Sequence, residues 1–170
     1  KVAAFEPLWL PFDHPLWIVY SSGTTGLPKP IVHGHGGTVI VALALKIIHN
    51  DVGCSYHPNN WGERYHWYSS TGWVMWNAQT SGLLNGTTCV IFDGNPGGPI
   101  SKTASPDLNT IWQFAADAGA TFFGAGAAFY ANCLKAGIQP AKVADLAKLR
   151  AIGSTGSPLA VDGYRWVWEQ

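Results

Sequence analysis

The sequence predicts an α/β domain with a largely parallel sheet, and three observations point to it. Short apolar runs rich in β-branched residues alternate along the chain with longer segments whose apolar residues recur at helical spacing. Loops rich in glycine, serine and threonine follow several of these runs, as is typical of the carboxyl ends of strands in such sheets. The chain has 170 residues, of which 47% are apolar, so its length suits one domain with a core.

The expected strands are short and are bounded by loop residues. The first, at residues 16–20, is an apolar run that ends at a loop of serine, glycine and threonine, and we expect it to be a buried strand. β-Branched and aromatic residues predict the others, because they favour the pleated backbone of a sheet. The further strands are expected at residues 65–69, 87–92, 121–123 and 149–152.

The sequence signals for the expected helices differ in clarity. The segment 38–48 is apolar almost throughout and follows two glycines, which favours a buried helix. The pattern is clearest at 108–118, where Asp107 can cap the first turn and Gly119 follows as a stop signal. The other helices are expected at 73–84, which precedes Gly86, at 127–136, which precedes Gly137, and at 161–169.

Charge and hydropathy exclude several classes of function. Ten basic and ten acidic residues give a net charge of zero, so the sequence has no electrostatic footprint for nucleic acid or for an anionic membrane. The longest apolar run, at 39–45, is far shorter than the roughly 20 residues that span a bilayer. Charged residues make up 12% of the chain, against a usual share of about 25%. We therefore expect part of the surface to pack against protein outside this chain.

Cysteine usage favours a cytoplasmic location. Cys54, Cys89 and Cys133 are odd in number and widely spaced, which does not fit a disulfide framework. We expect free thiols, as in cytoplasmic proteins. The histidines and cysteines show no spacing that closely matches a zinc pattern, so we expect no metal site among them.

The loop after the first expected strand is the strongest candidate for chemistry. Gly23 and Gly26 let the backbone turn tightly and bring its N–H groups close to a ligand. Hydroxyl donors and the positive charge of Lys29 complete a loop that suits a polyphosphate. A Walker A loop is disfavoured, because Pro28 stands in place of its second glycine and Pro30 follows the lysine. The candidate phosphate-binding residues are Ser21, Ser22, Gly23, Thr24, Thr25, Gly26 and Lys29.

The motif Ser-Gly-Thr-Thr-Gly-x-Pro-Lys in this loop resembles the phosphate-loop signature of the adenylate-forming superfamily. The segments at 12–20, 31–37, 70–77 and 153–159 resemble the acetoacetyl-CoA synthetase branch of that superfamily. The resemblance implies that residues 1–170 are part of the large N-terminal domain of an adenylate-forming enzyme. They would form a partial AMP-binding domain from which the small C-terminal domain is absent.

The resemblance implies an ATP-dependent acid–CoA ligase that uses ATP, Mg²⁺ and coenzyme A. Acetoacetate would attack the α-phosphate of ATP to give an acyl adenylate and diphosphate, and coenzyme A would then displace AMP. The loop at 21–29 would hold the β- and γ-phosphates. There, N–H, hydroxyl and lysine donors stabilise the charge that builds on the leaving diphosphate.

Two further sets of substrate contacts follow from the resemblance. The adenine-binding residues would be Gly156, Ser157 and Pro158, and the acyl-pocket residues would be Trp73, Val74 and Met75, with Thr155 opposite. Ser157 departs from the glutamate that acetate-activating relatives often carry at this point. Without the resemblance, the first set is an ordinary strand-to-helix turn and the second set belongs to a helix core.

Several groups that the family uses are not found in the chain. They are a Tyr-Gly-x-Thr-Glu motif whose glutamate helps to hold Mg²⁺, an aspartate for the ribose, and a lysine of the C-terminal domain. We therefore expect a central piece of a larger enzyme, without full activity alone, whose partners are its small-molecule substrates and the remainder of its own chain. Two alternatives stay open: an acetate- or propionate-type acyl-CoA synthetase, and a non-catalytic nucleotide-binding protein.

Overall fold

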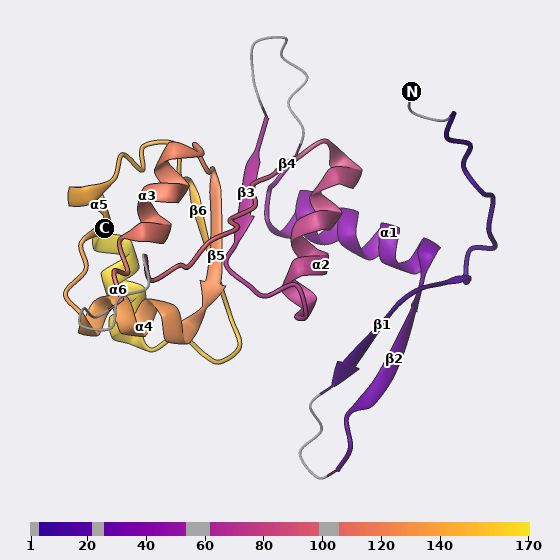
Figure 1. Cartoon of the computed structure of the whole chain (residues 1–170), viewed down its shortest axis with the longest axis horizontal. Helices are drawn as coiled ribbons and strands as arrows, with labels where there is room; N and C mark the ends of the chain where they lie inside the picture. The colour runs from indigo at the N-terminus through magenta and orange to yellow at the C-terminus, as the bar shows by residue number, and fades with distance from the viewer. Residues whose placement is uncertain (1–3, 22–25, 54–61, 99–105) are drawn as a thin grey trace.

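A computed structural model describes residues 4–21, 26–53, 62–98 and 106–170 of the chain. Its centre is a four-stranded parallel sheet in the order β4–β3–β5–β6. The strands are β3 (Arg64–Trp67), β4 (Thr88–Cys89), β5 (Phe122–Gly126) and β6 (Ala151–Thr155). Helices flank this sheet on both sides (Figure 1). The predicted α/β class with a parallel sheet is confirmed.

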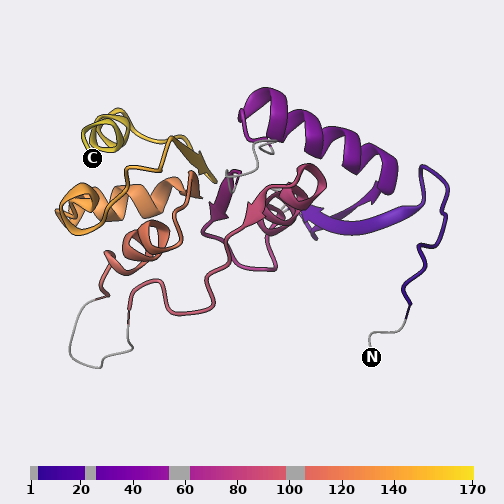
Figure 2. The ribbon, with the colours of Figure 1, turned by 90° about the horizontal axis from the view of Figure 1, so that it is seen from above.

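The helices form two layers. On one side of the sheet, α1 (His35–Leu43) runs on into a π-helix at Ala44–His49, and α2 (Val74–Thr80) runs on into a 3₁₀ helix at Ser81–Asn85. The other layer consists of α3 (Thr110–Asp117), α4 (Ala127–Lys135), α5 (Pro140–Val143) and α6 (Val161–Glu169). Figure 2 shows the sheet between these layers. Within the described ranges, every helix is too short or too polar to cross a membrane.

Several helix boundaries follow the sequence signals, but α1 begins earlier than expected, at His35, and α5 was not predicted. Gly86 and Gly119 lie just beyond helices and adopt φ of 74° and 61°, a left-handed backbone that glycine adopts without steric cost. The predicted helix at 108–118 begins later, at Thr110. The Asp107 carboxylate accepts a hydrogen bond from the Asn109 N–H at 3.0 Å. It therefore closes the turn before α3 instead of capping the helix.

The expectation of a buried strand at 16–20 is wrong. β1 (Pro15–Ser21) pairs antiparallel with β2 (Lys29–Gly34) and forms a hairpin separate from the parallel sheet (Figure 1). Two strands joined by so short a loop can pair only antiparallel, because a parallel partner requires a long crossover. Ile18 is 54% exposed in this hairpin. Lys29 is the first residue of β2 instead of a loop residue.

The segment 38–48 is helical as predicted, but it is not a buried helix. Ile40 and Ile48 are 60% and 75% exposed, and Lys46 is the one buried residue of the π-helix. Among the described residues, α1 contacts the 3₁₀ helix and the β1–β2 hairpin. Its apolar composition therefore reflects a surface left open among the described residues.

Alternate residues of the central strands face the two helical layers, as the two-residue period of a strand requires. Phe123 of β5 packs against Trp112 of α3 with ring centroids 4.6 Å apart. Its neighbour Phe122 points to the opposite face, where it stacks on Tyr65 of β3 at 4.6 Å. Each face of the sheet thus has its own apolar cluster.

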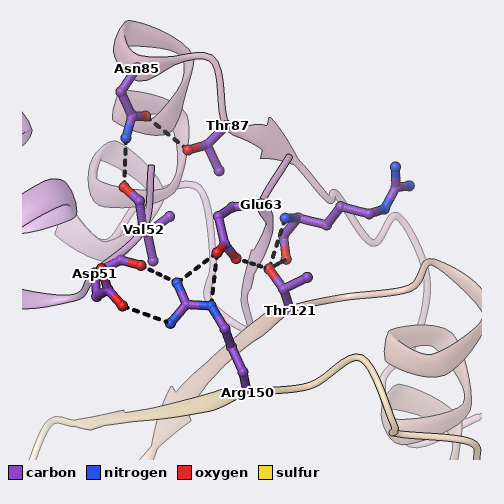
Figure 3. A network of polar contacts seen from close by, with 8 residues as sticks. Asp51, Val52, Glu63, Asn85, Thr87, Thr121 and Arg150 are labelled. Atoms are coloured by element: carbon purple, nitrogen blue, oxygen red, sulfur yellow. Dashed lines mark hydrogen bonds and ion pairs between the residues drawn. The ribbon is translucent and has the colours of Figure 1, made fainter. Parts of the chain in front are cut away.

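A network of polar contacts joins the amino ends of three strands. Glu63, Thr121 and Arg150 each stand one residue before a strand, namely β3, β5 and β6. Figure 3 shows the Glu63 carboxylate accepting hydrogen bonds from the Thr121 hydroxyl and from Arg150, whose Nε lies 2.8 Å from Oε1. The same guanidinium donates to the backbone carbonyl of Asp51. One cation therefore connects the sheet to the chain that follows the π-helix.

The network continues into the layer of α2. The Asn85 amide donates to the Val52 carbonyl at 2.7 Å, and the Thr87 hydroxyl donates to the Asn85 side-chain oxygen at 2.9 Å (Figure 3). Val52, Asn85 and Thr87 are all buried. Buried polar groups without partners would cost stability, so these bonds also fix where the 3₁₀ helix sits.

We predict that Arg150→Met lowers the free energy of unfolding by about 1–3 kcal/mol, because Glu63, whose side chain is 20% exposed, loses its charged partner. Arg165→Met is the matched control. Arg165 pairs with exposed Asp162 at 3.6 Å, and such a pair contributes about 1 kcal/mol or less. Urea unfolding of both variants is the measurement, and equal losses would contradict a special role for Arg150.

Candidate active site

A cavity of about 900 Å³ lies against the face of the sheet that carries Tyr65 and Phe122. Its walls come from the β1–β2 hairpin, from α1 and the π-helix, from α2, and from strands β3, β5 and β6. The walls are mostly apolar, with a few polar groups, as is usual for sites that bind small molecules. Lining residues with polar side chains include His33, Thr38, Lys46, His49, Asn50, Asn77, Ser81, Ser154 and Thr155.

Three of the four residues expected in the acyl pocket line this cavity. Val74 and Met75 belong to the first turn of α2, and Thr155 is the last residue of β6, at its carboxyl end. Trp73 is not a lining residue. It precedes α2 with an extended backbone, and its side chain is 52% exposed. The fold therefore brings together segments that are about 80 residues apart in the sequence, as the predicted pocket requires.

The described residues of the phosphate loop lie at the far end of the hairpin. Ser21 and Lys29 are direct partners in the β1–β2 register, so a hydroxyl and an amine share one end of the two strands. Gly26 is exposed, and a Cβ built on it would meet no atom within 4 Å. Ser22, Gly23, Thr24 and Thr25 lie outside the described residues. The cavity is lined instead by the other end of the hairpin, including Trp17 and Gly34.

The expected adenine loop follows β6 without a break. Gly156, Ser157 and Pro158 are exposed and do not line the cavity. Gly156 has φ of 90°, a backbone that side-chain-bearing residues rarely adopt, so glycine is required for the turn itself. Because Thr155 lines the cavity and Gly156 is next in the chain, this loop begins at the cavity wall.

The sequence alone did not single out Lys46, which the structure places in the cavity wall. Lys46 is only 3% exposed, its Nζ lies 2.9 Å from the centroid of the Tyr65 ring, and among the described residues it has no hydrogen-bond partner. Burial lowers its pKa to about 7, and the Cys89 thiol acts weakly in the opposite direction. The signal was present, since this residue interrupts the apolar run at 39–48.

The described residues do not form a metal centre. They contain no group of three or more His, Cys, Asp or Glu that could hold an ion. His66 is buried, and its Nδ1 lies 2.8 Å from the Val90 carbonyl, to which it donates. Burial lowers its pKa, so it is a neutral core histidine. The described part of the site therefore offers hydroxyl and amine donors, but no carboxylate set of the kind that Mg²⁺ prefers.

These features fit one class of proteins, and the comparison with known families agrees. The chain belongs to the AMP-binding enzyme family, whose model matches residues 3–170. It is similar to the acetoacetyl-coenzyme A synthetase of Rhizobium meliloti (strain 1021), with 41% identity over 160 residues, which are 94% of this chain and 22% of that protein. The malonamoyl-CoA synthetase of Penicillium aethiopicum is 34% identical over 171 residues, 96% of this chain and 23% of that protein.

The fold of the chain is also similar to that of a solved structure. The acetoacetyl-CoA synthetase from Streptomyces lividans matches 99% of this chain and 24% of its own chain, with a TM-score of 0.82 and 46% identity. The chain thus spans less than a quarter of the length of these relatives. The family is the adenylate-forming acyl-CoA ligases, and the fold is the corresponding part of their structure.

We predict that Lys46→Met raises the free energy of unfolding at pH 7 by about 2–4 kcal/mol, because the folded protein no longer buries an ammonium group. The pKa of Lys46 is about 7 in the fold and ordinarily 10.5, so unfolding binds a proton between these values. Stability of the parent therefore rises with pH from 7 to 10.5, and below pH 7 the penalty is complete.

The gain from Lys46→Met should accordingly be largest at and below pH 7 and should shrink towards pH 10.5. Thermal unfolding across this range is the measurement. Lys142→Met, at an exposed position of α5, is the control and should leave the pH dependence as it is. A gain that stays constant from pH 7 to 10.5 would show that charge burial is not the cause.

Proposed function

We propose that this chain is the central part of an ATP-dependent acid–CoA ligase that makes acetoacetyl-CoA, AMP and diphosphate from acetoacetate, ATP and CoA. The observation that carries the proposal is the cavity in which Val74 and Met75 meet Thr155 across apolar walls. The mostly apolar walls with a few polar groups suit a short acid whose carboxylate must reach a nucleotide. The similarity to two enzymes named for short acids with a carbonyl at the third carbon supports the same substrate class.

The first proposed step is adenylation. A carboxylate oxygen of the acid attacks the α-phosphorus of ATP, the bond from that phosphorus to the bridging oxygen breaks, and diphosphate leaves with the bonding electrons. Charge on the departing diphosphate needs oriented donors, each of which is typically worth a few kcal/mol. We assign this role to Ser21, Gly26 and Lys29, together with residues 22–25. The pairing of Ser21 with Lys29 in the hairpin register supports it.

The second proposed step is transfer to the thiol. The sulfur of coenzyme A, having lost its proton, attacks the acyl carbonyl carbon, and AMP leaves with the electrons of the acyl–oxygen bond. In both steps the adenosine is held by the loop at Gly156, Ser157 and Pro158, mainly through its backbone. A loop that starts at Thr155, in the wall of the acid cavity, suits an adenylate whose acyl and nucleotide parts are joined.

We assign Mg²⁺ no residue of the described chain. A bound ion would supply positive charge that stabilises the departing diphosphate. The described residues hold no suitable carboxylate cluster, so no step proposed here runs through the ion. We propose that its protein ligand belongs to another part of the polypeptide.

We propose that the remaining partner of this chain is further polypeptide of the same protein, which works in the cytoplasm. Large apolar side chains are exposed along the N-terminal segment, the hairpin, α1 and the π-helix, among them Trp9, Ile40 and Ile48. Extensive exposed apolar surface is usually covered by a partner. The chain also spans only 22–24% of its relatives. Alone it is expected to lack full activity, and Cys89 and Cys133 as free thiols suit the location.

Acid-dependent exchange between ATP and labelled diphosphate by the full-length protein tests the function. Among acetate, propionate, butyrate and acetoacetate, we predict the highest kcat/KM for acetoacetate, by about tenfold or more over butyrate. The reason is that a polar group of the cavity, such as the Thr155 hydroxyl, can donate to the 3-oxo oxygen that butyrate lacks. A preference for acetate or propionate would favour the alternative short-chain synthetase, and no exchange with any acid would leave only nucleotide binding.

Lys29→Ala tests the phosphate assignment in the same exchange assay. We predict a loss of about 10²- to 10³-fold in adenylation rate, with little change in the apparent affinity for the acid, because the lysine acts on the leaving diphosphate. Lys142→Ala, a removal of the same charge at an exposed position of α5, should keep the parent rate. Parental exchange by the Lys29 variant would overturn the assignment.

A further inference from the structure

Trp67 occupies a special position in the floor of the cavity. It is the last residue of β3, and its side chain lies on the same face of the sheet as Tyr65 and Phe122. The indole is stacked with both rings, at centroid distances of 6.3 and 6.2 Å, and is 8% exposed. It also lines the cavity. The indole is therefore a fixed wall element that a bound molecule would meet.

Two glycines make room for this indole on the neighbouring strands. Trp67 is in register with Gly124 of β5, and Gly124 is in register with Gly153 of β6, so the three residues form one row across the sheet. A Cβ on Gly124 would lie 2.1 Å from the indole, and a Cβ on Gly153 would lie 2.6 Å from it. Both distances are below any real contact. The indole therefore lies across the row in space that two side chains would otherwise fill.

The row sits directly beside the proposed acyl residues. Residues two positions further along β5 and β6 share the same face, and on β6 that residue is Thr155. The backbone N–H of Trp67 donates to the side-chain oxygen of Gln79 at 2.6 Å, and Gln79 belongs to α2, whose first turn carries Val74 and Met75. These contacts therefore fix the position of the indole relative to Val74, Met75 and Thr155, the residues assigned to the acid.

We propose that Trp67, seated on Gly124 and Gly153, determines the length of acid that the cavity accepts, and restricts it to short acids. This inference rests on the proposed function. The indole closes the space behind the acid, and each methylene that a rigid apolar wall excludes typically changes selectivity by about 10- to 200-fold. Trp67 makes no contact with the reacting atoms in this account, and its effect is on specificity alone.

The test compares acids of increasing length in the diphosphate exchange assay with the full-length protein. Trp67→Leu and the milder Trp67→Phe should each raise the ratio of kcat/KM for hexanoate to that for acetoacetate, by about tenfold or more for the leucine variant. Gly153→Ala should act in the opposite direction, because its methyl group drives the indole into the cavity. It should lower the ratio for butyrate relative to acetate.

Trp112→Phe is the matched control, since this buried tryptophan packs on the opposite face of the sheet against Phe123. It should cost stability and leave both kcat/KM ratios unchanged. Circular dichroism establishes that each variant is folded. If wild type activates acids but folded Trp67→Phe, Trp67→Leu and Gly153→Ala keep its kcat/KM ratios of hexanoate to acetoacetate and of butyrate to acetate, the inference is overturned and the proposed function stands. If wild type activates no acid, both fail.

Discussion

The parallel register of β3, β5 and β6 is the constraint on which the rest of this structure depends. It is fixed at the amino ends by side chains that stand one residue before each strand, where the Glu63 carboxylate joins the Thr121 hydroxyl to the Arg150 guanidinium. The same register aligns Trp67, Gly124 and Gly153 three or four residues further on. A slip of one residue would reverse the face of every side chain. The polar network and the floor of the cavity therefore both depend on the same strand register.

The two faces of the sheet serve different purposes. The face towards α3, α4 and α6 is closed by aromatic packing around Phe123 and Trp112. The face towards α1 and α2 carries the Tyr65, Trp67 and Phe122 stack and remains open as the cavity. A site needs such a difference, because a close-packed core leaves no room for a ligand. Lys46 extends over Tyr65 in this open layer and brings a poorly solvated amine to its wall.

The proposed contacts to the substrates come from two kinds of structure, the central sheet with α2 and the more exposed hairpin and loop. The acid would sit against strand ends and the first turn of α2, whose positions the sheet fixes. The proposed diphosphate donors stand on a separate hairpin, and the proposed adenine contacts stand on the loop after β6. Catalytic groups on loops that a rigid sheet supports are common in α/β folds. The family's reaction joins these three parts only through the substrate, which spans them.

Local signals in the sequence were sufficient for most elements, though not for β2 or α5, because strand and helix periods and glycine stops such as Gly86 and Gly119 depend on near neighbours in the chain. The loop motif at 22–29 was likewise sufficient to indicate the family to which the chain belongs. Only the tertiary structure decided that β1 and β2 leave the sheet as a hairpin, that the helix at 38–48 is largely exposed while Lys46 is buried, and that Trp67 lies over two glycines. These features arise from pairing and packing between distant segments. No local pattern encodes which strand becomes the neighbour of which, and that choice determined the shape of the cavity.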